Sequence, residues 1–267
     1  MQHFNLKGKI ALVTGALGLI GKEHCRALAD AGAQVIVADL DFTNCQLFCQ
    51  VLGIDSFPLS INISDAKSIQ QAVQQLEFHF EKIDILVNNA AINDHFSTDG
   101  SILEQSAFEN YPAHLLEKSW EVNVKGMVML TQALAPLLKK SKAASIINVA
   151  STYGMVGPDQ SLYTDLEGKQ LFYKTPAYPI TKGAVLNFTR YLAAYWGPIG
   201  IRVNTLSPGG VENGQDEVFL QKYAAKTPLK RMANSSDYGG ALVFLACEAS
   251  GYMTGANLVV DGGFTSI

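Results

Sequence analysis

Cysteine is scarce in this sequence, which has four in 267 residues. Four thiols without the dense spacing of a small secreted scaffold argue against a disulfide framework and favour a reducing compartment. Cys45 and Cys49 lie four residues apart on an expected helix, but without a nearby histidine or second cysteine pair they make a poor zinc site, so we expect them in the core. No metal centre is expected, because the histidines show no ligand spacing. We expect surface or hydrogen-bonded side chains at His3, His24, His79, His95 and His114.

Charge and long apolar runs are also sparse. Charged residues make up 16 % of the chain, the net charge is −4, and no lysine or arginine stripe provides an electrostatic footprint for nucleic acid. No apolar run approaches the roughly 18 residues that span a bilayer, and residues 1–8 lack the basic-then-apolar pattern of an export signal. We therefore expect a cytoplasmic protein with neither nucleic-acid nor membrane partners. The hydrophobic content of 48 % instead indicates a large core.

The segment at residues 10–21 is the most informative part of the sequence. A short apolar strand, Ile10 to Val13, runs into Gly15, Gly18 and Gly21, and an apolar-periodic segment follows. This order presents bare backbone N–H groups to a phosphate, because glycine removes the Cβ that would block the approach. The next strand ends at Asp39, roughly 20 residues downstream, where a carboxylate can hydrogen-bond a ribose diol. We expect a dinucleotide site; the alternative is a tight turn of some other α/β protein.

Apolar runs and helical patterns alternate along the chain. The alternation, with near-continuous apolar strands, predicts an α/β fold with one Rossmann-like, doubly wound parallel sheet of about seven strands and helices on both faces. No linker or repeat divides the chain, so we expect one domain over residues 1–267. The expected strands are 10–13, 35–38, 57–61, 83–87, 145–149, 201–206 and 257–260, and the expected helices are about 19–31, 43–52, 65–81, 114–140, 178–196, 214–225 and 236–248.

Long connections are expected at about 93–111, 152–175 and 210–228. They leave the carboxyl ends of strands, where ligands bind in open α/β sheets. Loops of this length are usually lids or binding loops, although a structural or subunit-contact role is the alternative.

Tyr178 and Lys182 lie four residues apart at the start of an expected helix, which places both side chains on one face. The free pKa of tyrosine is near 10, so a base working near neutrality needs about 3–4 kcal/mol of stabilisation of the phenolate. One ammonium group at ~4–5 Å supplies about that much at an effective dielectric near 20. The pair could therefore form a tyrosinate that accepts a hydroxyl proton, although a helix-surface pair is the alternative.

Other polar residues are expected near this pair. Ser151 ends the fifth strand, Asn89 follows the fourth, and Pro208-Gly209 follows the sixth. Asn123 lies in a helix among apolar neighbours, an unfavourable place for an amide without a partner.

Together these residues resemble the compact-length branch of the short-chain dehydrogenase/reductase family, from Lys9 to Asp261-Gly262-Gly263. The resemblance implies a catalytic tetrad of Asn123, Ser151, Tyr178 and Lys182. Ser151 would orient the substrate oxygen, Lys182 would also bind the nicotinamide ribose, and Asn123 would hold a water of a proton relay. The residues expected to contact the cofactor are Gly15, Gly18, Leu19, Ile20, Gly21, Asp39, Asn62, Ile63, Asn89, Ala90, Ala91, Tyr178, Lys182, Pro208, Gly209 and Val211.

Several positions depart from the family pattern. Leu19 stands where the middle glycine of the compact branch falls, and the spacing Gly15-x-x-Gly18-x-x-Gly21 is that of a longer branch that often handles nucleotide sugars. Asn62 replaces the usual aspartate for the adenine amino group, although an amide carbonyl can still accept that bond. Ser151 and Tyr178 are 27 positions apart, which is longer than the usual spacing. Gly210 follows Pro208-Gly209, and no threonine comes after it. A hydroxyl group that binds an amide in the family pattern is therefore missing.

The expected cofactor is NAD. The Asp39 carboxylate would repel the 2′-phosphate of NADP, and no arginine follows Gly15 or Asp39. We expect an NAD-dependent oxidoreductase that interconverts a secondary alcohol and a ketone, with Tyr178 as the acid/base. The alternatives are an epimerase or dehydratase that retains NAD, prompted by the glycine spacing, and a non-catalytic redox sensor that binds NAD.

The expected substrate is a small molecule, a polyhydroxylated sugar or sugar derivative, because the insertion and residues 189–196 look like a subgroup near flagellin-glycosylation and nonulosonic-acid pathways. Lysines in the flanking segments could meet an anion or could be solvated: Lys169, Lys174, Lys222 and Lys226. Steroid or acyl substrates remain open. The resemblance also implies a homotetramer or homodimer built from helices 114–140 and 178–196 and the last helix and strand.

Overall fold

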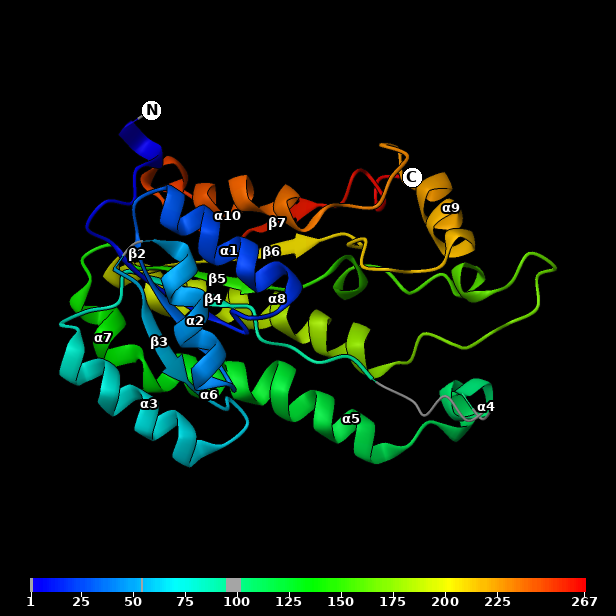
Figure 1. The fold of residues 1–267 in the computed structure, drawn as a ribbon, viewed down its shortest axis with the longest axis horizontal. Helices are drawn as coiled ribbons and strands as arrows, with labels where there is room; N and C mark the ends of the chain where they lie inside the picture. The colour runs from blue at the N-terminus through cyan, green and yellow to red at the C-terminus, as the bar shows by residue number, and fades with distance from the viewer. Residues whose placement is uncertain (1, 54, 95–101) are drawn as a thin grey trace.

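The described residues form one parallel sheet of seven strands in the order β3-β2-β1-β4-β5-β6-β7 (Figure 1). The computed structural model describes residues 2–53, 55–94 and 102–267. Each strand is a short apolar run, and the expected α/β architecture is confirmed. The strands are β1 (Ile10–Thr14), β2 (Gln34–Asp39), β3 (Phe57–Ser60), β4 (Ile85–Asn88), β5 (Ser145–Val149), β6 (Arg202–Pro208) and β7 (Asn257–Val260).

Helices cover both faces of the sheet, and α4 and α9 lie beyond its carboxyl edge, on the right of Figure 1. The α-helices are α1 (Leu19–Asp30), α2 (Phe42–Leu52), α3 (Ala66–His79), α4 (Ile102–Ser106), α5 (Ala113–Trp120), α6 (Met127–Ala133), α7 (Ala135–Lys140), α8 (Ala177–Trp196), α9 (Glu217–Lys226) and α10 (Gly239–Ala246). Single-turn elements are η1 (Gln2–Phe4), η2 (Phe108–Asn110), η4 (Thr152–Gly154), η5 (Gln160–Tyr163), η6 (Gly197–Ile199), η7 (Ser235–Tyr238) and η8 (Glu248–Ser250). A π-helical segment, η3 (Glu121–Gly126), joins α5 to α6.

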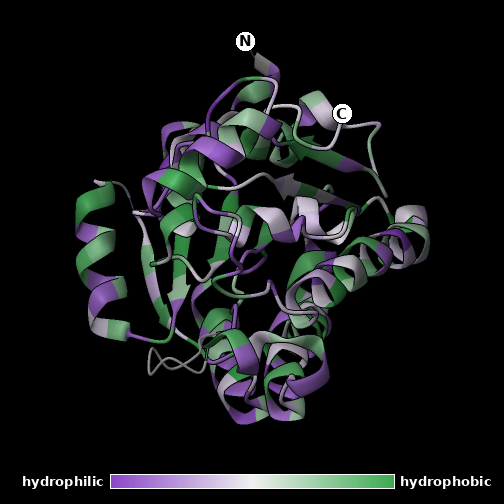
Figure 2. Ribbon diagram, turned by 90° about the vertical axis from the view of Figure 1, so that its right-hand side faces the viewer, coloured by the Kyte–Doolittle hydropathy of each residue, from purple (hydrophilic) through white to green (hydrophobic). Residues whose placement is uncertain are grey.

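Alternate residues of each strand enter two cores, as a sheet covered on both faces requires. Ala11 and Val13 face α1, α2 and α10, whereas Leu12 faces α3, α6, α7 and α8. Figure 2 shows mostly hydrophobic strands and helices banded by hydrophobic and hydrophilic residues. Each fully buried leucine, isoleucine or valine contributes about 1.5–3 kcal/mol. Cys45 and Cys49 are buried in the first core, as expected.

The expected single helix at 114–140 is wrong in detail, because the segment is interrupted twice. The backbone widens to π-helix at Glu121–Gly126, and α7 begins after Leu134 with Pro136 in its first turn. Proline removes a helical N–H, so a new helix starts there. The loop expected at 93–111 contains α4 and η2, and its residues 95–101, with His95, lie outside the described part of the chain. No described helix combines the length and apolar character needed to cross a membrane.

The insertion at 152–175 is attached to α9. Tyr163 packs with Phe172 and Phe219 in a small separate cluster. The Lys222 ammonium donates to the backbone carbonyls of Thr164 and Asp165, and Lys226 pairs with Asp159. The insertion and α9 therefore form one packed unit over the carboxyl edge of the sheet, and these two lysines are occupied by the protein itself.

His24 contradicts the expectation of a surface or hydrogen-bonded histidine. It is fully buried in α1, and neither ring nitrogen has a hydrogen-bond partner among the described residues. Burial lowers the pKa of His24 to about 4, because the charged imidazolium would lose its hydration.

The pH dependence of stability provides a test of this burial. An unfolded histidine titrates near 6.5, so between pH 6.5 and 4 the unfolded chain binds more protons at this position and stability falls as pH falls, by roughly 3 kcal/mol in all. We expect His24→Leu to remove this part of the acid destabilisation, measured by urea unfolding at pH 7, 5.5 and 4. The exposed residue His114 supplies the control variant His114→Leu, which should follow the wild-type curve. Equal pH dependence in wild type and His24→Leu would contradict the assignment.

Candidate active site

The glycine turn after β1 is tied directly to the end of β4. The Asn89 side-chain amide donates to the carbonyls of Thr14 and Gly15 at 2.9 and 3.0 Å, and the Thr14 hydroxyl accepts from the backbone N–H groups of Asn89 and Ala90. Gly15 has a φ of +61°, and a Cβ there would lie 2.8 Å from the Cα of Ala90. Only glycine permits this conformation at this distance.

A pocket of about 590 Å³ opens between the glycine turn and the ends of β2 and β4. This volume falls within the range of cofactor pockets. Most of the residues expected to contact the cofactor line it together: Gly15, Gly18, Leu19, Ile20, Gly21, Asp39, Asn62, Ile63, Asn89, Ala90 and Ala91. Helix α1 begins here after Gly18, with no side chain capping its first turn, so its first N–H groups are available to a phosphate. A Cβ on Gly21 would meet the Gly15 carbonyl at 2.0 Å, so the turn is built as a side-chain-free cradle that fits a dinucleotide.

Asp39 forms the far wall of this pocket. One carboxylate oxygen accepts the backbone N–H of Leu17 at 2.8 Å, and the other accepts that of Leu40 at 2.8 Å. The residue thus positions the glycine turn as well as placing a negative charge in the pocket. Both oxygens retain lone pairs with which they can accept a further donor.

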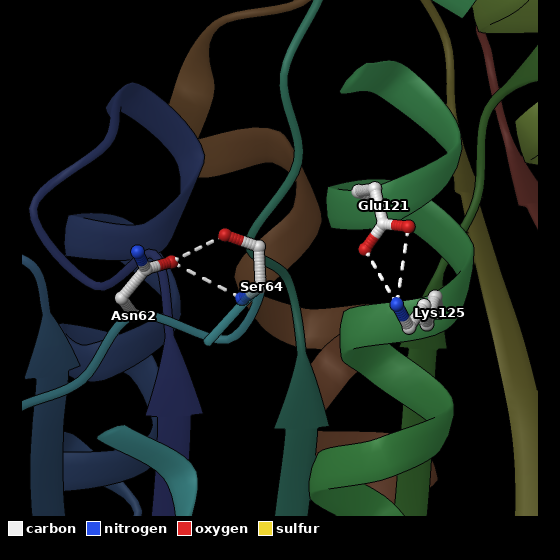
Figure 3. Close-up of polar contacts among 4 residues, drawn as sticks. All are labelled: Asn62, Ser64, Glu121 and Lys125. Carbon is white, nitrogen blue, oxygen red and sulfur yellow. Dashed lines mark hydrogen bonds and ion pairs between the residues drawn. The ribbon is translucent and has the colours of Figure 1, made fainter. Parts of the chain in front are cut away.

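Asn62 uses its amide differently from the sequence-based interpretation. Its Oδ1 accepts the backbone N–H of Ser64 at 3.1 Å and the Ser64 hydroxyl at 2.8 Å (Figure 3). The carbonyl expected to accept from an adenine amino group is therefore already engaged, and the Nδ2 group remains as a donor. Facing it in Figure 3, Lys125 pairs with Glu121 on the exposed surface of η3 at 2.9 Å.

Tyr178, Ser151 and Lys182 come together at the carboxyl edge of β5. Burial raises the pKa of the Tyr178 phenol above its usual value, and a hydrogen bond with the Ser151 hydroxyl opposes this rise. The Lys182 ammonium donates to the carbonyl of Val149 at 2.8 Å and lies 5.6 Å from the centroid of the Tyr178 ring. Burial lowers the pKa of Lys182 to about 8. The expected lowering of the Tyr178 pKa by Lys182 is thus wrong for this arrangement, because desolvation of the phenol dominates.

Asn123 lies in the π-helical segment and links the pocket to α8. Its Oδ1 accepts the N–H of Ile92 at 2.8 Å, while its Nδ2 donates to the Ile92 carbonyl at 2.9 Å and to the Thr181 hydroxyl at 3.2 Å. The amide that lacked an expected partner therefore has partners for both its oxygen and its nitrogen. π-Bulges occur frequently at functional sites, where they redirect a side chain or free a carbonyl.

Pro208, Gly209 and Val211 lie at the carboxyl end of β6 and just after it. Gly209 is pressed against Asp261, where a Cβ would meet the Asp261 Cα at 2.8 Å. Val211 forms an isolated bridge with Ala233. These three residues are not among those that line the 590 Å³ pocket.

Three residues outside the expected catalytic and cofactor-binding sets also belong here, and one of them, Lys174, was among the four lysines considered for an anion. Lys174 places its ammonium 4.9 Å from the centroid of the Tyr178 ring. Thr181 donates to the Tyr178 carbonyl at 3.0 Å while it accepts from Asn123. Gly154 touches α8, where a Cβ would meet the Lys182 carbonyl oxygen at 2.7 Å. The sequence offered a signal for Thr181, which precedes Lys182, and for Lys174 as a candidate anion-binding lysine. The contacts of Lys174 and Gly154 with α8 depend on how the insertion folds.

Comparisons with known proteins agree on the fold and the general chemistry. A family model described as Enoyl-(Acyl carrier protein) reductase matches residues 15–265. The chain is 32 % identical to a D-arabinitol 2-dehydrogenase of Candida albicans (99 % of this chain, 95 % of the relative) and 30 % identical to a D-threitol dehydrogenase of Mycolicibacterium smegmatis (98 % and 95 %).

Solved structures extend the likeness to cofactor complexes. A gluconate 5-dehydrogenase from Burkholderia cenocepacia in complex with NADP and tartrate superposes with a TM-score of 0.84 at 28 % identity, over 99 % of this chain and 98 % of that one. A short-chain dehydrogenase from Leptospira borgpetersenii with bound NAD+ superposes with a TM-score of 0.82 at 33 % identity, over 98 % and 94 %.

The close contact at Gly154 predicts a difference between two glycines of the same loop. We expect Gly154→Ala to lower the free energy of unfolding by about 1–3 kcal/mol, because the added methyl group must push η4 away from the backbone of α8. Gly157 has nothing within 4 Å of a Cβ, so Gly157→Ala should be neutral or slightly stabilising. Denaturant unfolding of both variants measures the difference, and equal stabilities would show that η4 and α8 are not in this contact.

Proposed function

The chain belongs to the short-chain dehydrogenase/reductase family, and on this premise we propose that it is an NAD(H)-dependent dehydrogenase that interconverts a secondary alcohol and a ketone on a polyhydroxylated substrate. The observation that carries the proposal is the placing of Tyr178 and Lys182 at the carboxyl end of β5, where the Lys182 ammonium lies 5.6 Å from the centroid of the Tyr178 ring and donates to the Val149 carbonyl, two residues before Ser151. The bonds from Ile92 through Asn123 to Thr181 join this pair to the glycine-lined pocket.

Tyr178 moves the proton in this mechanism. In reduction, its phenol, which burial keeps in the protonated form, donates the proton to the substrate carbonyl oxygen. In oxidation, the phenolate accepts the hydroxyl proton from the same position. The Ser151 hydroxyl, held beside the phenol, orients the substrate oxygen. Lys182 supplies a positive charge 5.6 Å from the centroid of the Tyr178 ring, held by the Val149 carbonyl.

A nicotinamide cofactor would be held by the glycine cradle, the N-terminus of α1 and Asp39, and it would supply the hydride exchange at the substrate carbon. Asp39 favours NAD, because its carboxylate repels a 2′-phosphate. Asn89 holds the cradle in shape through Thr14 and Gly15.

The polyhydroxylated substrate class is supported by the relatives that act on arabinitol and threitol and by the gluconate dehydrogenase among the similar structures. The insertion at 152–175 adds hydroxyl-bearing side chains beside Tyr178. Tyr153 and Tyr163 hydrogen-bond each other through their hydroxyl groups at 3.0 Å. Such groups provide the polar contacts that a polyol needs.

The protein is proposed to form a homodimer or homotetramer through α5, α6 and α8. These helices carry large exposed side chains, with Trp120, Ile180, Tyr191 and Tyr195 each at least 44 % exposed. Exposed apolar side chains that gather on neighbouring helices support an association surface.

Replacement of the phenol tests the proposed mechanism. We expect Tyr178→Phe to lower kcat by at least 10²–10⁴-fold, because it removes the proton donor, while cofactor binding stays within a few-fold of wild type. NADH fluorescence reports both quantities across a panel of polyols and sugars. The control is Tyr191→Phe, which changes an exposed tyrosine on the same helix and should leave turnover unchanged. Normal turnover by Tyr178→Phe would refute the mechanism; tightly retained NAD without any net change in free NADH would favour an epimerase or dehydratase.

Cofactor choice tests the role of Asp39. We expect wild type to use NAD over NADP by about 10–100-fold in kcat/KM, which corresponds to a charge repulsion of about 1.4–2.8 kcal/mol between Asp39 and the 2′-phosphate. Asp39→Asn keeps an oxygen for the Leu17 N–H but removes the charge, so this preference should shrink. Asp30→Asn, at the far end of α1, is the control. If turnover with NADP matches or exceeds that with NAD in wild type, Asp39 does not bind the ribose diol of the cofactor.

A further inference from the structure

A second lysine lies against the proposed proton donor. The Lys174 ammonium is 4.9 Å from the centroid of the Tyr178 ring, compared with 5.6 Å for Lys182. Lys174 is the last lysine of the insertion and lies four residues before Tyr178. Because the ring centroid and the phenol oxygen belong to one rigid side chain, a group bound to this ammonium lies within a short carbon chain of the reacting hydroxyl.

The backbone of Lys174 is held in place on both sides. The Gln160 side chain accepts the N–H of Lys174 at 2.8 Å and donates to its carbonyl at 3.0 Å. The next residue, Thr175, donates its hydroxyl to Asp94. The preceding residue, Tyr173, donates its N–H to the Ser106 hydroxyl at 2.9 Å. The ammonium is therefore presented from a fixed position, and a fixed donor loses little entropy on binding a ligand.

Lys174 forms no direct ion pair within the described residues, although, against the larger effect of burial, the negative charge of the nearby Asp94 raises its pKa and so favours the charged form. Its ammonium donates to the neutral Oδ1 of Asn93 at 2.9 Å, and no described carboxylate lies within ion-pair distance. The nearby Asp94 carboxylate is occupied by other donors: Tyr111 at 2.8 Å, Ser119 at 3.2 Å and Thr175. Burial lowers the pKa of Lys174 to about 8, so the group is still mostly protonated at neutral pH.

We propose that Lys174 binds an anionic group, a carboxylate or a phosphate, of the polyhydroxylated substrate. The proposal rests on the proposed function, since it names the substrate class of the same site. An ammonium has three donors, and within the described part of the chain Asn93 engages one of them. A partly dehydrated, unpaired ammonium gains more from an incoming anion than a solvated one, because less hydration is lost on binding. Lys174 would thus select acidic polyols over neutral ones.

The other lysines of this region differ from Lys174. Lys222 and Lys226 are engaged in holding the insertion to α9, and Lys169 is exposed at its tip. Lys169 therefore supplies a matched control, since it carries the same charge in the same insertion but lies away from Tyr178.

Binding and turnover are measured separately for wild type, Lys174→Met and Lys169→Met. The ligands are gluconate, glucitol 6-phosphate and glucitol, which share a polyol chain but differ in charge. Calorimetric titration in saturating NADH, with which a polyol cannot react, gives the dissociation constants, and the appearance of NADH fluorescence in assays with NAD gives kcat and KM. Methionine keeps the length of the side chain and removes its charge, and thermal unfolding verifies that each variant is folded.

We expect wild type to bind gluconate or glucitol 6-phosphate more tightly than glucitol, and the tighter of the two identifies the anion. Lys174→Met should weaken binding of the anionic ligand about 10–100-fold, because a hydrogen bond from a charged group is lost. The change should appear in KM rather than in kcat. Glucitol should change less than threefold, and Lys169→Met should match wild type.

Three results would overturn the proposal: no binding of either anion, equal affinity for neutral and anionic polyols in wild type, or an equal loss for all ligands in Lys174→Met. Selective anion binding without any turnover would instead refute the proposed dehydrogenase activity and leave the role of Lys174 supported. Turnover of glucitol without a preference for anionic ligands would refute the role of Lys174 and leave the proposed dehydrogenase activity supported.

Discussion

The hydrogen bonds from Asn89 to Thr14 and Gly15 tie the glycine turn to the end of β4 at the point where the strand order reverses. Open α/β sheets bind ligands at such a point, because the chain leaves neighbouring strands in opposite directions and a crevice remains. Gly15 can enter this contact only without a Cβ, since Ala90 lies at 2.8 Å. The same constraint therefore fixes the pocket and keeps its floor free of side chains.

The proposed reacting groups stand on the second half of the sheet and depend on this crevice through Asn123. Ser151 follows β5, whereas Tyr178 and Lys182 belong to α8. The three side chains can meet only if the distance between β5 and α8 is fixed. Gly154 sets the contact between η4 and α8, and Asn123 joins the loop after β4 to Thr181. A regular α-helix would point the Asn123 side chain in a different direction, and the π-helical turn corrects this. The distortion of the helix thus places the two halves of the site in register.

The strands and the glycine turn could be predicted because their signals are local. Apolar runs bounded by turns identify β1 to β7, and the spacing of Gly15 to Asp39 needs only one strand–helix–strand unit. The π-helical segment left no such signal, since its residues are compatible with a regular helix. The burial of His24 depends on neighbours that are distant in sequence. The hydrogen bonds of Asn62 depend on one rotamer of its side chain. Lys174 was one of four candidate loop lysines, and only the fold of the insertion separates it from Lys222 and Lys226.

The folding of this region carries an electrostatic cost that the insertion helps to offset. Burial lowers the pKa of both Lys174 and Lys182 to about 8, so near neutral pH two ammonium groups are held partly dehydrated around one phenol. Their folded pKa values lie below the usual 10.5, so the unfolded chain binds more protons between pH 8 and 10.5, and stability from these groups rises with pH across that window. At neutral pH the penalty is fully present. The apolar cluster of Tyr163, Phe172 and Phe219 and the ties from Lys222 and Lys226 oppose it by holding the insertion on α9. An insertion without these contacts would relieve the penalty by releasing Lys174 into water, and the charge would no longer lie against the phenol.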